Sequence, residues 1–487
     1  MFALHAPREL PRPRIRPAEA AILPELANPA PVLSTSASPT LPRYWPTSSG
    51  TQFNPVASAP QGGVFTFTRG LPGSETASIS FSDRRVRTTS NSGPRSSLGQ
   101  QWSFMHHGAR LELQIRNNTH GFFIRVDNRF VSLTPYETSG HVMVMVDFGT
   151  SAVRRIDIIS WGLAFAGVYT DPTDCLFAAE LRGPRAIVLG DSFTSPEPDN
   201  WVSWFSHAMG WDDVWASGAG GTGFVADAQG TGYSIPDRVM SDVVPFAPDL
   251  VFLHAGINDM SRDPSEVEAA AARTVKLIRE NVPGVVVAGG VDTAFGVESW
   301  SAHNLDVKDA VRSGMESEGA GWISPFELPF DFGGNPIGHQ ATLYASIVAG
   351  QAGNDGTPTS VTHPNGFVCN TSVSNPAVNL RVGSVVEIGT DATRERVAIT
   401  CTGYHHARVA YGFDGAMQYD HAPGEPVREV APCFVTGQGS TAAPSGWGSA
   451  DRYVGADSFH YSPEGHMALG IVNASLLRHH LRGRALI

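Results

Sequence analysis

A serine directly after a short apolar run is the first residue of this chain that could act as a nucleophile. The run AIVLG at 186–190 predicts a strand buried on both faces, and Ser192 follows it in the sequence GDSFT. Open α/β sheets place reactive groups at the carboxyl ends of their strands, where a helix N-terminus also stabilises negative charge. An ordinary strand-to-helix turn explains this pattern as well, so a catalytic Ser192 requires partners elsewhere in the chain.

Asp457 and His460 are the partners that the sequence offers. A serine hydroxyl is a weak nucleophile unless a base contacts it, and the base needs a group that orients it. Asp457 and His460 stand three residues apart in the sequence DSFH, just before a helical stretch. The carboxylate can therefore hold one tautomer of the imidazole while the other ring nitrogen faces Ser192. A surface turn is the alternative explanation for this spacing.

Attack on an ester also creates an oxyanion, which needs hydrogen-bond donors fixed in place. Asn258 follows a second apolar run, DLVFLHAG, and its side-chain amide is one candidate donor. We expect the backbone N–H groups of Ser192 and Gly218 to be the others. Gly220 or Gly221 could take the place of Gly218.

In chain order, these motifs resemble the four conserved blocks of the SGNH/GDSL hydrolase family. The blocks are Gly190-Asp191-Ser192, Gly218, Gly256-x-Asn258-Asp259 and Asp457-x-x-His460. The resemblance covers about 185–330 and 449–487, which is less than half of the chain. It implies a three-layer α/β/α domain that hydrolyses esters through an acyl-enzyme on Ser192, without a metal or another cofactor. Asp259 is expected to brace its loop.

Two segments precede this domain. Residues 1–60 are dense in Pro, Ser, Thr and Ala and show no sustained period, which predicts an extended arm or linker. A disordered tail and an arm docked on a neighbouring subunit both fit this composition. Residues 61–180 alternate apolar and polar side chains, as at Leu111, Leu113 and Ile115, and predict an antiparallel, jelly-roll-like β-sandwich.

The hydrolase domain is expected in two pieces, 181–333 and 446–487, where apolar strands alternate with helical stretches as in a doubly wound sheet. The helical stretches lie near 201–209, 263–281, 305–318 and 462–481. Between the pieces, residues 334–445 are rich in Gly, Thr, Asn and Val and too numerous for a loop. They predict a small inserted β domain. A sandwich before a hydrolase domain also resembles the arrangement in some carbohydrate esterases that deacetylate polysaccharides.

Composition excludes several other classes of protein. The 487 residues carry a formal net charge of -12, which would repel a nucleic-acid backbone. Neither the four cysteines nor the paired histidines have metal-ligand spacing, so we expect no metal site, and one disulfide among Cys369, Cys401 and Cys433 stays open. No apolar run reaches the length of a membrane span, and Arg and Pro interrupt the N-terminal region where a secretory signal would need an apolar stretch. These features favour the cytoplasm or assembly into a virus particle.

The sequence therefore predicts a serine esterase whose substrate is an acylated glycan, from which it removes O-acetyl groups. A lipase or thioesterase acting on longer acyl chains is the alternative within enzymes. A second alternative is a mainly structural or receptor-binding virion protein, such as a phage tail component that contacts other tail proteins through the Pro-rich arm and the inserted segment. Homo-oligomerisation is left open.

Overall fold

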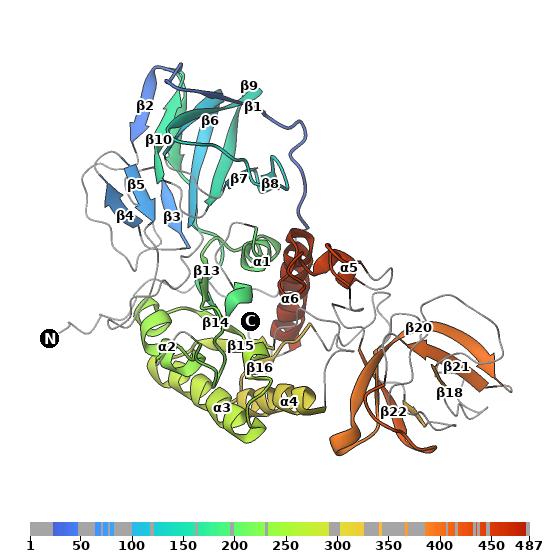
Figure 1. Ribbon diagram of the computed structural model, residues 1–487. Coiled ribbons are helices and arrows are strands. Elements are labelled where there is room, and N and C mark those ends of the chain that lie inside the picture. Colours follow the sequence, from blue (N-terminus) through green and yellow to red (C-terminus); the bar gives the residue numbers. More distant parts are fainter. Residues whose placement is uncertain are drawn as a thin grey trace.

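The computed structural model comprises a β-sandwich, an α/β domain and an inserted β sheet (Figure 1). The structure describes residues 23–46, 64–69, 72–75, 78–81, 100–116, 121–160, 164–194, 199–228, 232–291, 302–325, 340–342, 366–368, 385–405, 408–413, 417–431, 435, 439–444 and 449–483. No helix within these ranges is long and apolar enough to cross a membrane.

The α/β domain is built on a parallel sheet with the strand order β13-β12-β14-β15-β16. The strands are β12 (Ala186–Gly190), β13 (Val214–Gly218), β14 (Leu250–His254), β15 (Val286–Gly290) and β16 (Gly321–Trp322). Every residue of β12 and β14 is buried, which explains why both read as continuous apolar runs.

Helices cover both faces of this sheet, so the domain has three layers (Figure 1). α1 and α6 pack together, and α2, α3 and α4 form the second group. Their bounds are α1 (Trp201–Met209), α2 (Ile235–Asp242), α3 (Pro264–Asn281), α4 (Ala302–Ser317) and α6 (Pro463–Gly483), with the short α5 (Ala450–Tyr453) before α6. α3 begins as the sequence predicts, because Asp263 accepts a hydrogen bond from the Ser265 amide.

The β-sandwich has two layers that share two long strands, β6 (Gln100–Arg116) and β9 (Val142–Ser160). These strands pair along their length, with a register shift between Gly108 and Arg110. On one side of the shift they pair with β3 (Thr66–Thr68), β11 (Cys175–Ala178) and β7 (Phe122–Val126), and on the other with β10 (Ala164–Thr170) and β1 (Val32–Ser36). The smaller strands are β2 (Arg43–Pro46), β4 (Pro72–Glu75), β5 (Ser78–Phe81) and β8 (Arg129–Phe130). Trp102 and Leu113, from the two halves of β6, lie in one apolar core.

Residues 23–46 belong to this sandwich, which corrects the prediction of an arm or linker for that part of 1–60. β1 pairs with β9, and β2 pairs with β10 on the other side of the same layer. Between them the chain passes over Glu112 of β6, whose carboxylate accepts the amides of Thr40 and Leu41, each at 2.9 Å. Glu112 is only 1% exposed as a result. The side chains of β1 are exposed or half-buried, so the segment carries no apolar alternation.

The inserted segment forms an antiparallel sheet with the strand order β17-β22-β19-β20-β21-β18. Its strands are β17 (Gln340–Thr342), β18 (Gly366–Val368), β19 (Val385–Ile388), β20 (Glu395–His405), β21 (Arg408–Phe413) and β22 (Pro426–Ala431). Arg394 joins it to the α/β domain through ion pairs with Asp306 (2.8 Å) and Asp309 (3.0 Å) of α4. Cys369 and Cys433, two of the three residues considered for a disulfide, lie outside the described residues.

A buried histidine between two glutamates should make the stability of the inserted sheet depend on pH. His421 contacts Glu395 through Nε2 (2.8 Å) and Glu425 through Nδ1 (2.7 Å). Burial alone lowers the pKa of His421, but the bonds and attraction to both carboxylates outweigh it and raise the pKa above 6.5. Because the folded pKa is the higher one, this stabilisation is complete below pH 6.5 and is lost as pH rises through the raised value.

We therefore expect the thermal transition of the wild-type inserted sheet to move to lower temperature between about pH 6 and pH 9, with a smaller movement in His421→Gln. Circular dichroism melts of the full chain across this range measure both. An identical pH dependence in the two proteins would contradict the assignment.

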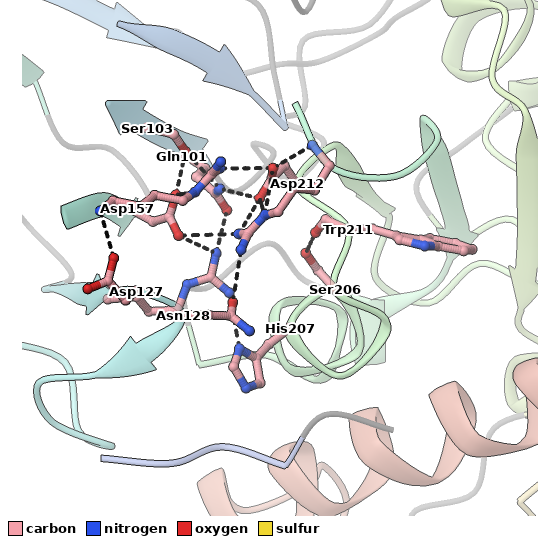
Figure 2. Close-up of polar contacts among 12 residues, drawn as sticks. Gln101, Ser103, Asp127, Asn128, Asp157, Ser206, His207, Trp211 and Asp212 are labelled. Carbon is pink, nitrogen blue, oxygen red and sulfur yellow. Dashed lines mark hydrogen bonds and ion pairs between the residues drawn. The ribbon is translucent and has the colours of Figure 1, made fainter. Parts of the chain in front are cut away.

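A buried ionic cluster joins the sandwich to the α/β domain (Figure 2). Asp157 of β9 and Asp212, which precedes β13, are 0% and 1% exposed. Asp157 contacts Arg125 (3.2 Å), Arg155 (2.9 Å) and Arg182 (3.3 Å). Arg155 and Arg182 also contact Asp212, at 2.9 and 2.8 Å. The two arginines therefore bridge a carboxylate of one domain and a carboxylate of the other.

His207 of α1 extends this cluster as a neutral ring. Its Nδ1 accepts a hydrogen bond from Arg125 (3.1 Å), so the proton lies on Nε2, which faces the carbonyl oxygen of Leu23 (3.3 Å). Burial, and then the charge of Arg125, lower the pKa of His207 to about 3. Beside the cluster, Phe123 and Phe130 of the sandwich pack against Trp204 of α1. The interface is thus both apolar and ionic.

Candidate active site

Ser192 lies at the carboxyl end of β12, in the short 3₁₀ helix η1 (Ser192–Thr194). β12 is hydrogen-bonded to β13 and β14, so its end lies within the sheet and not at an outer edge. Gly190 permits this turn, because a Cβ there would lie 2.2 Å from Thr194 Oγ1 and 2.5 Å from the carbonyl oxygen of His254. The position fits the rule that reactive groups gather where parallel strands end.

The structure brings His460 and Asp457 to Ser192, although 268 positions separate Ser192 from His460. The Nε2 atom of His460 lies 3.0 Å from Ser192 Oγ, and its Nδ1 lies 2.6 Å from Asp457 Oδ2. The other Asp457 oxygen accepts the amides of Phe459 and His460, each at 2.9 Å. This order of contacts lets the histidine accept a proton from the hydroxyl while the carboxylate stabilises the charged ring.

Asp457 stays ionised in this arrangement. Burial pushes the pKa of Asp457 upward, but the hydrogen bonds from the His460 ring and from the amides of Phe459 and His460 outweigh it and lower the pKa. An ionised carboxylate is the form that can fix the tautomer of His460.

The ring of Phe193 packs against the ring of His460. Phe193 is fully buried, and its ring centroid lies 4.9 Å from that of His460 and 5.4 Å from that of Tyr461. Its carbonyl oxygen accepts a hydrogen bond from Asn200, which also caps α1. The residue after the nucleophile thus ties the Ser192 turn to the His460 loop and to α1.

Asn258 lies in the 3₁₀ helix η3 (Ile257–Asp259), directly after the β14 strand end. Its Nδ2 donates to the carbonyl oxygen of Thr222 (2.9 Å) and lies 3.5 Å from Asp191 Oδ2. The other Asp191 oxygen accepts the amide of Phe193 at 3.0 Å. The buried Asp191 carboxylate therefore adjoins both the turn of Ser192 and the amide of Asn258.

Gly218, the third predicted oxyanion donor, ends β13 opposite Gly190. A Cβ at Gly218 would lie 2.6 Å from the carbonyl oxygen of Asp191 and 2.5 Å from that of Thr194. Only a glycine allows the strand to approach the nucleophile turn so closely. Gly221, considered as an alternative, lies instead against Ala228.

Asp259 joins its own loop to the segment 224–226, which agrees with the bracing role that the sequence predicts. Its carboxylate accepts the amides of Phe224 (2.6 Å), Val225 (3.0 Å) and Ala226 (2.7 Å). Burial raises the pKa of Asp259, and these three amides act against that rise.

Phe193 and Thr222 had no predicted role in the site, and Asp191 was named only as a member of the first block. Asp191 and Phe193 flank Ser192 in the chain, so the motif itself held the signal for them. Thr222 contributes a backbone oxygen, which no side-chain pattern reveals. Among the described residues, no three His, Cys, Asp or Glu side chains are grouped so as to hold a metal ion.

Residues 188–365 match the family of GDSL-like lipases and acylhydrolases. The chain contains a GDSL-like lipase/acylhydrolase domain. The match includes Ser192, Gly218 and Asn258, whereas Asp457 and His460 follow after it. The family assignment identifies an acyl ester hydrolase domain, and the contacts of Asp457 and His460 come from the structure. A comparison with curated proteins finds no match.

Several solved structures are similar to this chain at low identity. A family two carbohydrate esterase from Cellvibrio japonicus is 17% identical, with a TM-score of 0.41, over 63% of this chain and 93% of that one. An acetyl xylan esterase from the rumen bacterium Butyrivibrio proteoclasticus is 10% identical, with a TM-score of 0.41, over 58% and 89%. A salicylyl-acyltransferase from a tetracycline biosynthetic pathway is 13% identical, with a TM-score of 0.41, over 54% and 83%.

Proposed function

We propose that the GDSL-like domain is a serine esterase that forms an acyl-enzyme on Ser192. The observation that carries this proposal is the continuous contact from Ser192 Oγ through His460 to Asp457 at the end of β12. The match to acylhydrolases supports an ester as the substrate.

In the first half of the proposed reaction, Ser192 Oγ attacks the carbonyl carbon of the ester while His460 Nε2 takes the hydroxyl proton. Asp457 stabilises the imidazolium that forms. The tetrahedral intermediate collapses when His460 gives this proton to the leaving alcohol, which leaves the acyl group on Ser192. In the second half, water attacks the acyl-enzyme with His460 again as base, and the acid leaves.

Asn258 has one hydrogen available for the oxyanion. One N–H of its amide is used by Thr222 at 2.9 Å, and the other faces Asp191 Oδ2 at 3.5 Å, which is long for a hydrogen bond. An oxyanion beside the amide would offer this hydrogen a shorter and charged acceptor. The backbone amides of Ser192 and Gly218 complete the proposed oxyanion hole.

The substrate that we propose is the O-acetyl group of a polysaccharide. The side chains of His460 and Asp457 are 41% and 52% exposed, so the reacting groups lie at the surface, where an ester on a large molecule can reach them. The sandwich before the hydrolase domain adds support, because some carbohydrate esterases have this order of domains. A long acyl chain would instead need an apolar channel for its tail.

Acetate release from acetylated polysaccharide, measured for wild type and Ser192→Ala, tests this function. We expect wild type to release acetate and Ser192→Ala to lose about 10⁴-fold or more in kcat, because the variant lacks the hydroxyl that contacts His460. A fluorophosphonate should add its mass to wild type and not to Ser192→Ala. Full acetate release by the variant would overturn the serine mechanism. A strong preference for long p-nitrophenyl esters would favour the lipase or thioesterase alternative.

A further inference from the structure

The turn that carries the catalytic pair contains a residue in an unfavourable backbone conformation. Ser458, between Asp457 and His460, has φ of 59°, in the left-handed region that side chains other than glycine disfavour. The turn closes on itself, since the amide of Gly455 donates to the His460 carbonyl (2.6 Å) and the amide of Ser458 donates to the Gly455 carbonyl (3.0 Å). The positions of Asp457 and His460 therefore depend on Ser458 keeping this conformation.

The catalytic pair lies near the surface, where the rings of Phe193 and Phe459 contact the ring of His460. Both side chains are about half exposed, and the ring of His460 packs on Phe193 on one side. Besides these rings and the bond to Asp457, the conformation of the turn orients His460 toward Ser192.

The end of the inserted segment supplies a contact to this turn. Ser440 is 2% exposed, and its Oγ accepts a hydrogen bond from Ser458 Oγ at 3.1 Å. The Ser440 side chain is itself fixed, because its Oγ also accepts the amide of Ala443 (3.2 Å). In the same segment, the amide of Thr441 donates to the carbonyl oxygen of Val454 (2.9 Å). Ser440, which belongs to the inserted segment, therefore forms a hydrogen bond with Ser458, the residue with the left-handed backbone conformation in the catalytic turn.

We propose that Ser440 is a positioning residue for His460, and that it acts by giving the Ser458 side chain a hydrogen-bond partner in the left-handed conformation. Without this bond, the backbone of Ser458 lowers its free energy by moving to a conformation with negative φ. This movement changes the direction of the chain between Asp457 and His460. His460 Nε2 would then leave its position 3.0 Å from Ser192 Oγ. The inference rests on the proposed function, and it gives the return segment of the insertion a part in assembling the active site.

The test is a double-mutant cycle with glycine at 458. Ser440→Ala and Ser458→Ala both remove the bond and keep the strain, so each should lower kcat for p-nitrophenyl acetate by about 10-fold to 100-fold with little change in KM. Ser458→Gly removes the bond and the strain together, so it should lose less kcat than Ser458→Ala. Ser440→Ala should then have almost no effect in the Ser458→Gly background, and Ser440→Thr, which keeps a hydroxyl, should retain most of the activity.

Two controls make the outcomes distinct. Ser475→Ala removes an exposed serine of α6, bonded to the carbonyl of Ile471, and should leave kcat unchanged. Circular dichroism confirms that each variant is folded. The positioning role of Ser440 would be overturned if Ser440→Ala had wild-type kcat, or if Ser440→Ala lowered kcat equally in the wild-type and Ser458→Gly backgrounds. In either case, loss of activity in Ser192→Ala would still support the proposed esterase function. Full activity in Ser192→Ala would overturn both.

Discussion

His460→Ala is expected to lower kcat/KM for p-nitrophenyl acetate by about 10⁴-fold to 10⁶-fold. The side chain is the group in contact with Ser192 Oγ, at 3.0 Å, so its removal leaves the hydroxyl without a base in the attack and the leaving alcohol without a proton donor. Steady-state rates with the purified variant measure the loss. Asp457→Asn should cost about 10⁴-fold, because an amide in contact with His460 Nδ1 favours the wrong tautomer.

The same experiment contains its controls. His303→Ala removes an exposed histidine of α4 and should leave the rate unchanged. The double variant Ser192→Ala/His460→Ala should lose no more than the stronger single variant, since the two residues act as a unit. A His460→Ala rate within tenfold of wild type, or a further large loss in the double variant, would show that His460 is not the base.

Asp157→Ala should cause the largest loss of stability, about 3 to 5 kcal/mol in the free energy of unfolding. Its carboxylate faces Arg125, Arg155 and Arg182 in a fully buried site, so the variant leaves three guanidinium groups with one negative partner fewer (Figure 2). Urea unfolding followed by circular dichroism measures the change.

The pH dependence of the free energy of unfolding gives a second test of the role of Asp157. Burial raises the pKa of Asp157, but the three arginines outweigh it and hold the pKa well below the ordinary 3.8. Because the folded pKa is the lower one, the stabilisation is present above pH 3.8 and is lost as pH falls toward the folded value, so wild type and variant should converge in acid.

Asp171→Ala is the matched control for this variant. Its ion pair with Arg110 (3.0 Å) is exposed to solvent and should contribute less than about 1 kcal/mol. If Asp157→Ala and Asp171→Ala cost the same, the cluster is not an interdomain support.

The elements that carry the site were predictable because they follow local rules. Ser192 and Asn258 each stand after a continuous apolar run, and such runs are buried parallel strands whose ends meet at one edge of a sheet. The helical stretch predicted at 263–281 agrees with the observed α3 (Pro264–Asn281) to within one residue. The contact between Ser192 and His460 needed the resemblance to a family, because nothing local links residues so far apart in the chain.

The parts that were missed depend on contacts between distant segments. Arg155 and Asp157 stand two apart on β9 and thus on one face, yet their partner Asp212 lies in another domain. The Ser440–Ser458 contact joins the insertion to the last part of the hydrolase domain, and a backbone angle such as that of Ser458 leaves no trace in the sequence. Several expectations from the sequence stay predictions: the acylated glycan substrate, a virion location, contacts with other tail proteins, the lack of nucleic-acid binding and homo-oligomerisation.

The path of the chain over Glu112 has a practical consequence for anyone who shortens this protein. Residue 61 is where the sequence suggests that the folded part begins, but a chain trimmed to that point would lack both β1 and β2. Glu112 would lose the amides of Thr40 and Leu41, and the edges of β9 and β10 would be left unpaired and open to association with other chains. Aggregation of such a truncated protein would then result from the loss of β1 and β2 from the sandwich, and it would not show that the hydrolase domain is misfolded.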